Sequence, residues 1–284
     1  MVNRILLARL DDIFRAWRRH LWGWRFWFGL LGGLAIALGI QWSSYGLSSD
    51  LLTRLPQAQI HPLPEVLQGT PDPTTATEDY FGAVTPSPLG HLIWSEFPVK
   101  VYVAPLDPTV SPAAQQRQQQ WQRATLAAIA QWQAYIPLLT VETIETADII
   151  IQRQAPLIQR ETDPETGEIR YSLGRNAETR YEFYIDDRNI LRHRMTILLN
   201  DHQGAIATQN TACHELGHAL GIWGHSPNAV DALFPRQMGT QARISAADIN
   251  TLRKIYQQPT RLGWPMPPFA NKKLADPHSL KEGQ

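Results

Sequence analysis

The 284-residue chain contains one cysteine, Cys213, so no intramolecular disulfide can form. This excludes a small secreted scaffold held together by disulfides, although an oxidising compartment is not excluded. The charges balance, with 26 Lys and Arg residues against 26 Asp and Glu residues. A general nucleic-acid-binding protein is therefore not expected, because such a protein is basic over a face or a domain. The length favours one globular domain with attached segments.

A basic segment followed by an apolar run forms the N-terminus. Residues 1–20 are rich in arginine, and residues 21–42 contain Arg25 as their only charge. A span of about 20 mostly apolar residues can cross a bilayer as a helix, and basic residues before it favour a cytoplasmic N-terminus. We therefore predict a single-pass membrane protein, anchored in the lipid bilayer, with the rest of the chain outside the cytoplasm. A cleaved signal peptide, which would leave a secreted protein, is the alternative.

The remaining chain divides by composition into three parts. Residues 43–90 are rich in Pro, Ser and Thr and have neither helical nor strand periodicity, so we expect an extended linker. Residues 91–258 are expected to form the folded domain, and the proline-rich residues 259–284 an irregular tail.

The domain shows the patterns of both strands and helices. Ser111 and Pro112 begin a helix as N-cap and first residue, with Trp121, Leu126, Ile129 and Trp132 as its expected inner face. A second helix carries the histidines described next, and a third begins at Ser245. Alternating or β-branched runs predict the five strands 93–103, 138–144, 147–153, 181–185 and 190–199. The order indicates an α+β domain with one mixed sheet packed against helices.

The segment from Thr211 reads TACHELGHALGIWGHS and carries the chemistry. His214 and His218 are four residues apart, so on a helix both imidazoles can reach one Zn²⁺. Glu215, beside the first histidine, is the candidate catalytic residue, a general base toward a water that the ion activates. A third ligand is needed, and His225 is the best candidate because Gly221 can end the helix and turn the chain back. Asp231 is the alternative, although a role in a turn suits it better.

This stretch resembles the metzincin signature H-E-x-x-H-x-x-G-x-x-H, in particular that of the matrixin branch. The resemblance covers roughly residues 90–258. It implies a zinc metalloendopeptidase that acts on peptide or protein substrates, with a five-stranded sheet, three helices, His214, His218 and His225 as ligands and Glu215 as general base. The sequence departs from the pattern twice. One extra residue precedes His225, and the position of the family's Met-turn methionine, a structural floor under the metal, falls on Leu233.

Several other residues have less specific patterns. Cys213 is expected to be a small buried residue, and His193 and His202 to lie on the surface. The family often has a structural Ca²⁺, and Asp186, Asp187 and Asp201 are candidate carboxylates for it without an assignment. Because of the two departures, a catalytically impaired zinc- or peptide-binding module at the membrane is the alternative function.

Overall fold

The computed structural model describes residues 54–69, 78–157, 160–162, 169–171, 175–236 and 243–268. The basic segment 1–20 and the predicted membrane span 21–42 lie outside these residues. Among the helices that are described, none has the length and apolar character that crossing a bilayer requires.

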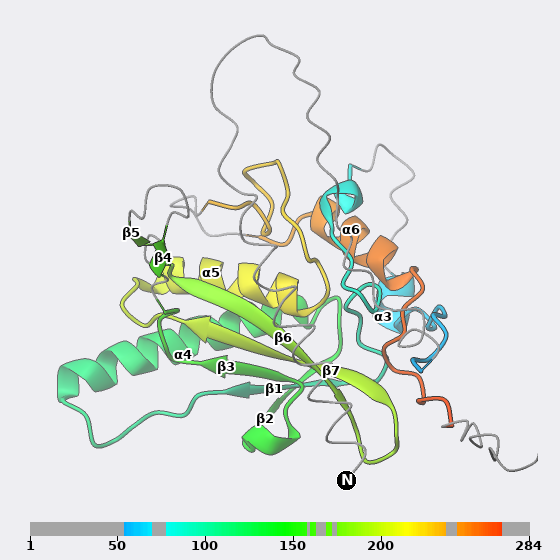
Figure 1. The fold of residues 1–284 in the computed structure, drawn as a ribbon. Coiled ribbons are helices and arrows are strands. Elements are labelled where there is room, and N and C mark those ends of the chain that lie inside the picture. Colours follow the sequence, from blue (N-terminus) through cyan, green and yellow to red (C-terminus); the bar gives the residue numbers. More distant parts are fainter. Residues whose placement is uncertain are drawn as a thin grey trace, which may run out of the picture. The chain divides into compact units, whose positions relative to one another are not determined.

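A five-stranded sheet forms the centre of the described domain (Figure 1). Its strands run in the order β2-β1-β3-β7-β6, and all are parallel except β6, which pairs antiparallel with β7 at the sheet edge. The mixed sheet of the α+β prediction is confirmed. The strands are β1 (Val99–Val103), β2 (Leu138–Val141), β3 (Ile149–Gln152), β6 (Ala177–Ile185) and β7 (Leu191–Leu199).

A separate antiparallel pair, which the sequence did not predict, consists of β4 (Arg160–Thr162) and β5 (Ile169–Tyr171). The segment TDPETGE at residues 162–168 is typical of a turn, and most of it lies outside the described residues. The tetrad Asp186-Asp187-Arg188-Asn189 between two β-rich runs predicts a hairpin turn, and the structure confirms it, because β6 and β7 flank these residues as antiparallel neighbours. Asn189 adopts a positive φ of 61° there, a conformation that asparagine tolerates better than most residues.

The three predicted helices are also confirmed. They are α4 (Pro112–Trp132), α5 (Ala205–Ala219) and α6 (Ala246–Tyr256), with Ser111 and Ser245 as the N-caps of α4 and α6. Shorter turns of helix are α3 (Glu65–Gly69), η1 (Phe81–Ala83) and η2 (Ile144–Thr146). Helices α4 and α5 pack against each other (Figure 1).

The inner face of α4 differs from the prediction at one position. Trp121, Ile129 and Trp132 are buried as expected, but Leu126 is 40% exposed. Five residues after Trp121, Leu126 is rotated by about 140° around the helix axis, whereas small residues such as Ala124 and Ala128 complete the buried stripe.

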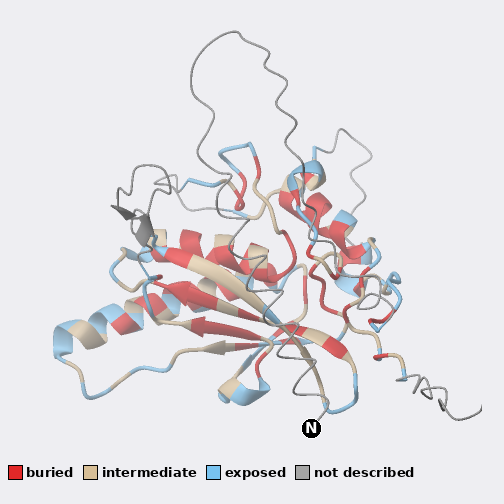
Figure 2. Ribbon diagram, in the orientation of Figure 1, coloured by how far each residue is buried: buried red, intermediate tan, exposed pale blue. Residues whose placement is uncertain are grey.

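The core lies between the sheet and these two helices (Figure 2). Alternate residues of the central strands point into it and are completely buried: Val99, Val101, Ile149, Ile151, Met195 and Ile197. Two tryptophans of α4 fill the space between the helices and the sheet, and the indole N–H group of each donates a hydrogen bond to a backbone carbonyl. Trp121 donates to the carbonyl of Leu199 at 3.2 Å, and Trp132 donates to that of Cys213 at 2.9 Å. The second bond ties α4 to the residue next to His214.

The expected linker differs from the structure in its described parts. Residues 54–69 and 78–90 pack on the domain, where Leu55, Leu67 and Leu89 are buried. Apolar residues spaced between the prolines give the segment enough surface to bury without regular secondary structure. The described tail is irregular as predicted, yet it also packs: Gln59 and Thr260 exchange backbone hydrogen bonds of 3.0 and 2.9 Å.

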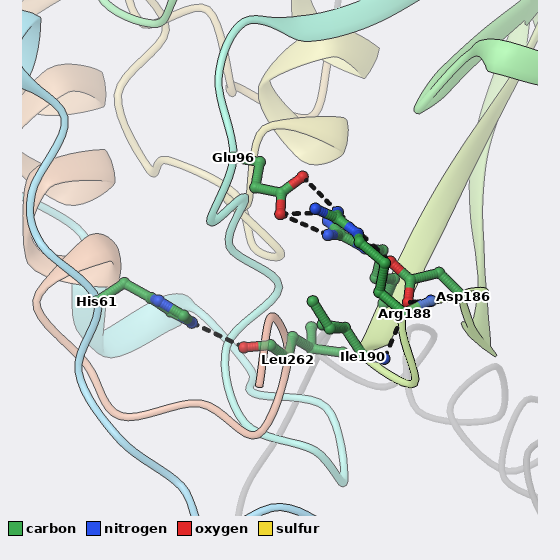
Figure 3. A network of polar contacts seen from close by, with 7 residues as sticks. His61, Glu96, Asp186, Arg188, Ile190 and Leu262 are labelled. Atoms are coloured by element: carbon green, nitrogen blue, oxygen red, sulfur yellow. Dashed lines mark hydrogen bonds and ion pairs between the residues drawn. The ribbon is translucent and has the colours of Figure 1, made fainter. Parts of the chain in front are cut away.

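A network of charges fastens the β6–β7 hairpin to the residues before β1 (Figure 3). Arg192 bridges Asp186 and Glu96 at 2.5 and 2.6 Å, and Arg188 also donates to Glu96. Nearby, the ring of His61 hydrogen-bonds the carbonyl of Leu262 at 2.8 Å. Arg188 is largely exposed, so its ion pair contributes little.

Candidate metal centre

Helix α5 presents two histidines one turn apart. The Nε2 atoms of His214 and His218 lie 3.0 Å from each other. Two nitrogen ligands of a tetrahedral Zn²⁺ at 2.0–2.1 Å would be about 3.3–3.4 Å apart. The observed separation therefore needs only a small side-chain adjustment to fit such an ion.

Both rings are oriented by backbone carbonyls. The Nδ1 atom of His214 lies 2.9 Å from the carbonyl oxygen of Ala232, and that of His218 lies 2.7 Å from the carbonyl oxygen of Ile222. A carbonyl can only accept, so each Nδ1 carries the proton and each Nε2 presents its lone pair. Two lone pairs facing each other at 3.0 Å repel unless a cation lies between them, and this chemistry fits a zinc site.

His225 completes the group. Its ring centroid is 5.2 Å from that of His214 and 4.9 Å from that of His218. Potential ligand atoms of the three residues all lie within 4.8 Å of one another. Across the described ranges, no other cluster of at least three His, Cys, Asp or Glu side chains approaches this closely.

The extra residue before His225 is absorbed in the loop after α5. Gly221 has a φ of +124°, and a Cβ atom there would lie 2.6 Å from the carbonyl oxygen of Leu92. Gly224 leaves equally little room, because a Cβ atom would overlap the carbonyl group of Ala83. Because both glycines lack a side chain, the loop between α5 and His225 can pack closely against the backbone of Ala83 and Leu92. This packing turns His225 toward the helix.

Leu233 lies where the family pattern has methionine. It is completely buried, and a Cβ atom on Gly217 would lie 2.6 Å from its Cδ2 atom. Gly217 immediately precedes His218 in α5, so Leu233 packs directly against the helix that carries the histidines. Its carbonyl accepts the N–H of Ser226 at 3.0 Å, which closes the loop after His225. An apolar side chain of similar volume thus lies under the group.

Glu215 is buried beside His214 and contacts the edge strand. Its Oε2 atom accepts a 2.5 Å hydrogen bond from the hydroxyl of Thr179 in β6. Burial raises the pKa of the Glu215 carboxyl group above its ordinary value, while His214 and the Thr179 bond oppose the rise. No local sequence pattern indicates Thr179, because its role depends on the position of β6 relative to α5.

Aromatic side chains border the group on the side of His218. Trp223 lies edge-on to His218, with ring centroids 5.8 Å apart, and edge-on to Tyr181 at 5.1 Å. Tyr181 in turn lies 5.1 Å from Phe183 on the same face of β6. Trp223, Tyr181 and Phe183 are each partly exposed. Together they form an apolar platform between the edge strand and the loop that precedes His225.

The other candidate residues lie apart from this group. Cys213 is buried as expected, and burial raises its pKa to about 12. His202 is exposed as predicted, but the prediction that His193 lies on the surface is wrong. His193 is 3% exposed and stacks on Trp94, with ring centroids 3.9 Å apart. A strand histidine on the inward-facing register is indistinguishable from a surface histidine until that register is known.

The candidate carboxylates have structural contacts of their own. Asp231 is buried and accepts a 2.5 Å hydrogen bond from the Ser226 hydroxyl, which supports its expected role in a turn. Asp186 accepts the N–H groups of Arg188 and Ile190 and pairs with Arg192. A calcium site at Asp186, Asp187 and Asp201 stays unassigned.

A comparison with protein-family models matches residues 107–257 to the Matrixin family. The match covers slightly more than half of the chain and includes the three histidines and Glu215. This chain belongs to the matrixin family. The resemblance seen in the sequence is therefore confirmed, and with it membership of a family of zinc metallopeptidases. No curated protein matches the chain in sequence. The matrixin match begins at residue 107, so residues 54–69 and 78–106 are described parts of the folded domain that the family model does not cover.

Proposed function

We propose that this matrixin is a zinc-dependent endopeptidase that hydrolyses peptide bonds in protein substrates. The proposal rests chiefly on one observation, the convergence of His214, His218 and His225 next to the buried carboxylate of Glu215. Two of these rings hold their Nδ1 protons against backbone carbonyls, which leaves nitrogen lone pairs for an ion.

The three histidines would hold the zinc, and Glu215 would act as the general base. When bound, zinc polarises the scissile carbonyl and lowers the pKa of a bound water to about 7. Glu215 would accept a proton from the attacking water and pass it to the leaving amine. Thr179 donates to one carboxylate oxygen of Glu215 and so restrains the orientation of the other.

The edge strand β6 would bind the substrate backbone. Its one partner within the described sheet is β7, so its outer side can accept an extended peptide by strand addition. Thr179 places this strand beside Glu215. Main-chain hydrogen bonds would then align the scissile bond with the centre while demanding little of the substrate's side chains.

Casein cleavage by the full chain tests the proposal. We expect cleavage that a chelator abolishes and added Zn²⁺ restores, and Glu215→Gln to lose cleavage while keeping wild-type zinc content. Tyr102→Phe, on β1 away from the centre, is a control that should cleave normally. If wild type and Glu215→Gln bind equal zinc and neither cleaves, the alternative of a non-catalytic zinc-binding module is supported instead.

We also propose that residues 21–42 anchor this catalytic domain to a membrane, on the grounds of their apolar composition and the basic residues before them. Retention of the full chain in the membrane fraction after alkaline carbonate washing, with the domain accessible to external protease, is the expected result. Release of the chain by the wash, or an N-terminus that begins after residue 42, would contradict an uncleaved anchor.

A further inference from the structure

We propose that Tyr80 is a positioning residue for the metal centre, and that residues 79–85 fasten the loops that carry two of the metal ligands. This inference rests on the proposed function, because it takes His214 and His225 as ligands. The segment precedes the matrixin match, and its composition alone predicts a linker.

The first fastening passes through a buried carboxylate in α6. The hydroxyl of Tyr80 donates to Asp248 at 2.5 Å, and the other oxygen of Asp248 accepts the N–H of Ala232 at 2.9 Å. The carbonyl of Ala232 is the group that orients the ring of His214, also at 2.9 Å. The Tyr80 phenol is therefore connected to a predicted metal ligand through Asp248 and the backbone of Ala232, which is hydrogen-bonded on both sides.

Asp248 depends on the phenol because it is completely buried. Besides Tyr80 it accepts the N–H groups of Ala232 and Ser245, the second at 2.8 Å. A buried carboxylate that loses one charge-assisted donor is left with an unsatisfied lone pair, which costs more than an ordinary hydrogen bond. Burial and the neighbouring carboxylate raise the pKa of Tyr80, so the phenol keeps its proton and its role as donor.

The backbone around Tyr80 is fixed to the same helix. Its N–H donates to the buried hydroxyl of Thr251 at 3.0 Å. The preceding Asp79 pairs with Lys254 at 2.6 Å. These two contacts with α6 hold residues 79–80 in one position, so the phenol meets Asp248 with little further loss of conformational freedom.

The second fastening acts on the loop that ends at His225. Just after η1, the N–H of Thr85 donates to the carbonyl of Trp223 at 3.0 Å. The α-carbon of Gly224 lies against the carbonyl group of Ala83 so closely that no side chain fits between them. Trp223 and Gly224 are the two residues before His225. Residues 79–85 thus support both ligands. They support the ring of His214 indirectly, through Asp248, and they contact the backbone before His225 directly.

Zinc affinity of the full chain, measured by competition with a chromophoric chelator, tests the inference on Tyr80→Phe. The variant keeps the ring and removes only the hydroxyl. Tyr256→Phe is the matched control, because Tyr256 is also buried and its hydroxyl donates to the carbonyl of Leu220 at 3.1 Å. Each variant loses one buried hydrogen bond. Only the hydroxyl of Tyr80 is connected to the ring of His214, through Asp248 and Ala232.

We expect Tyr80→Phe to weaken zinc binding about tenfold, at the lower end of the effect of groups that orient metal ligands, and to alter the visible absorption of the Co²⁺-substituted protein. Tyr256→Phe should lower the melting temperature while leaving zinc affinity and the Co²⁺ spectrum unchanged. Gly224→Ala, which displaces the loop by a different contact, should also weaken zinc binding. Wild-type zinc affinity in Tyr80→Phe, or equal weakening in both tyrosine variants, would overturn the role of Tyr80.

Wild-type affinity in Gly224→Ala would overturn the second fastening. These results differ from failure of the proposed function, which would appear as a wild-type chain without zinc binding.

Discussion

Mild acidification should destabilise the domain, and replacing His193 with phenylalanine should make this loss of stability much smaller. His193 is buried in β7 and stacks on Trp94, and its Nε2 atom has no hydrogen-bond partner among the residues that the structure describes. Burial, with a smaller effect of Arg192, lowers its pKa from 6.5 to about 3. The folded state therefore holds His193 in its neutral form, whereas the unfolded chain binds a proton below pH 6.5.

The sign and size follow from linkage. The pKa of His193 is lower in the folded state than in the unfolded chain. The contribution of neutral His193 to the free energy of unfolding is therefore complete above pH 6.5 and is lost progressively as the pH falls toward 3. Between pH 7 and pH 5 the loss amounts to about 2 kcal/mol of the free energy of unfolding. Phenylalanine keeps the aromatic contact with Trp94 but binds no proton.

Urea unfolding at pH 7 and pH 5 measures this difference. All samples contain a chelator, so that zinc release does not add its own pH dependence. Met195→Leu, a non-titrating change on the same buried face of β7, is the control and should show the wild-type difference between the two pH values. If His193→Phe loses as much stability on acidification as the wild type, the burial of a neutral histidine is not what links stability to pH.

Three further predictions concern the candidate centre. Thr179→Val should lower kcat/KM about tenfold with unchanged zinc content, because it removes a hydrogen bond to the Glu215 carboxylate; unchanged kcat/KM would contradict this. Leu233→Met should change the free energy of unfolding by less than about 1.5 kcal/mol in denaturant titration and retain zinc, since the volumes are similar; loss of zinc would contradict it. Gly221→Ala should destabilise the domain by at least about 1–3 kcal/mol in the same assay, because of its positive φ and the nearby Leu92 carbonyl; a neutral effect would refute the strained conformation.

The sequence predicted those parts of the fold that depend on local patterns. Periodicity placed the helices and the main strands, and the serine N-caps marked where α4 and α6 begin. The spacing of His214 and His218 predicted a shared face because a helix turn is a local property. The position of the His225 ring could not be derived from a local pattern, because it depends on how Gly221 and Gly224 approach other backbone segments.

What the sequence could not predict depends on contacts between distant segments. Tyr80 and Thr179 have no local signature, because each acquires its role from a carboxylate more than 30 residues away in the chain. The burial of His193 depends on strand register, since a shift of one residue would turn it outward. The exposure of Leu126 shows a similar limit, because small residues such as Ala128 define the buried face of α4 as well as large ones do.

Zinc K-edge X-ray absorption on the zinc-loaded protein tests the central claim most directly, since it counts and identifies the ligands. We predict three imidazole nitrogens at about 2.0–2.1 Å and no sulfur at about 2.3 Å in the wild type, with one imidazole fewer in His225→Ala. A wild-type spectrum with two imidazoles, one with sulfur from Cys213, or a spectrum that His225→Ala leaves unchanged would contradict a centre built from His214, His218 and His225.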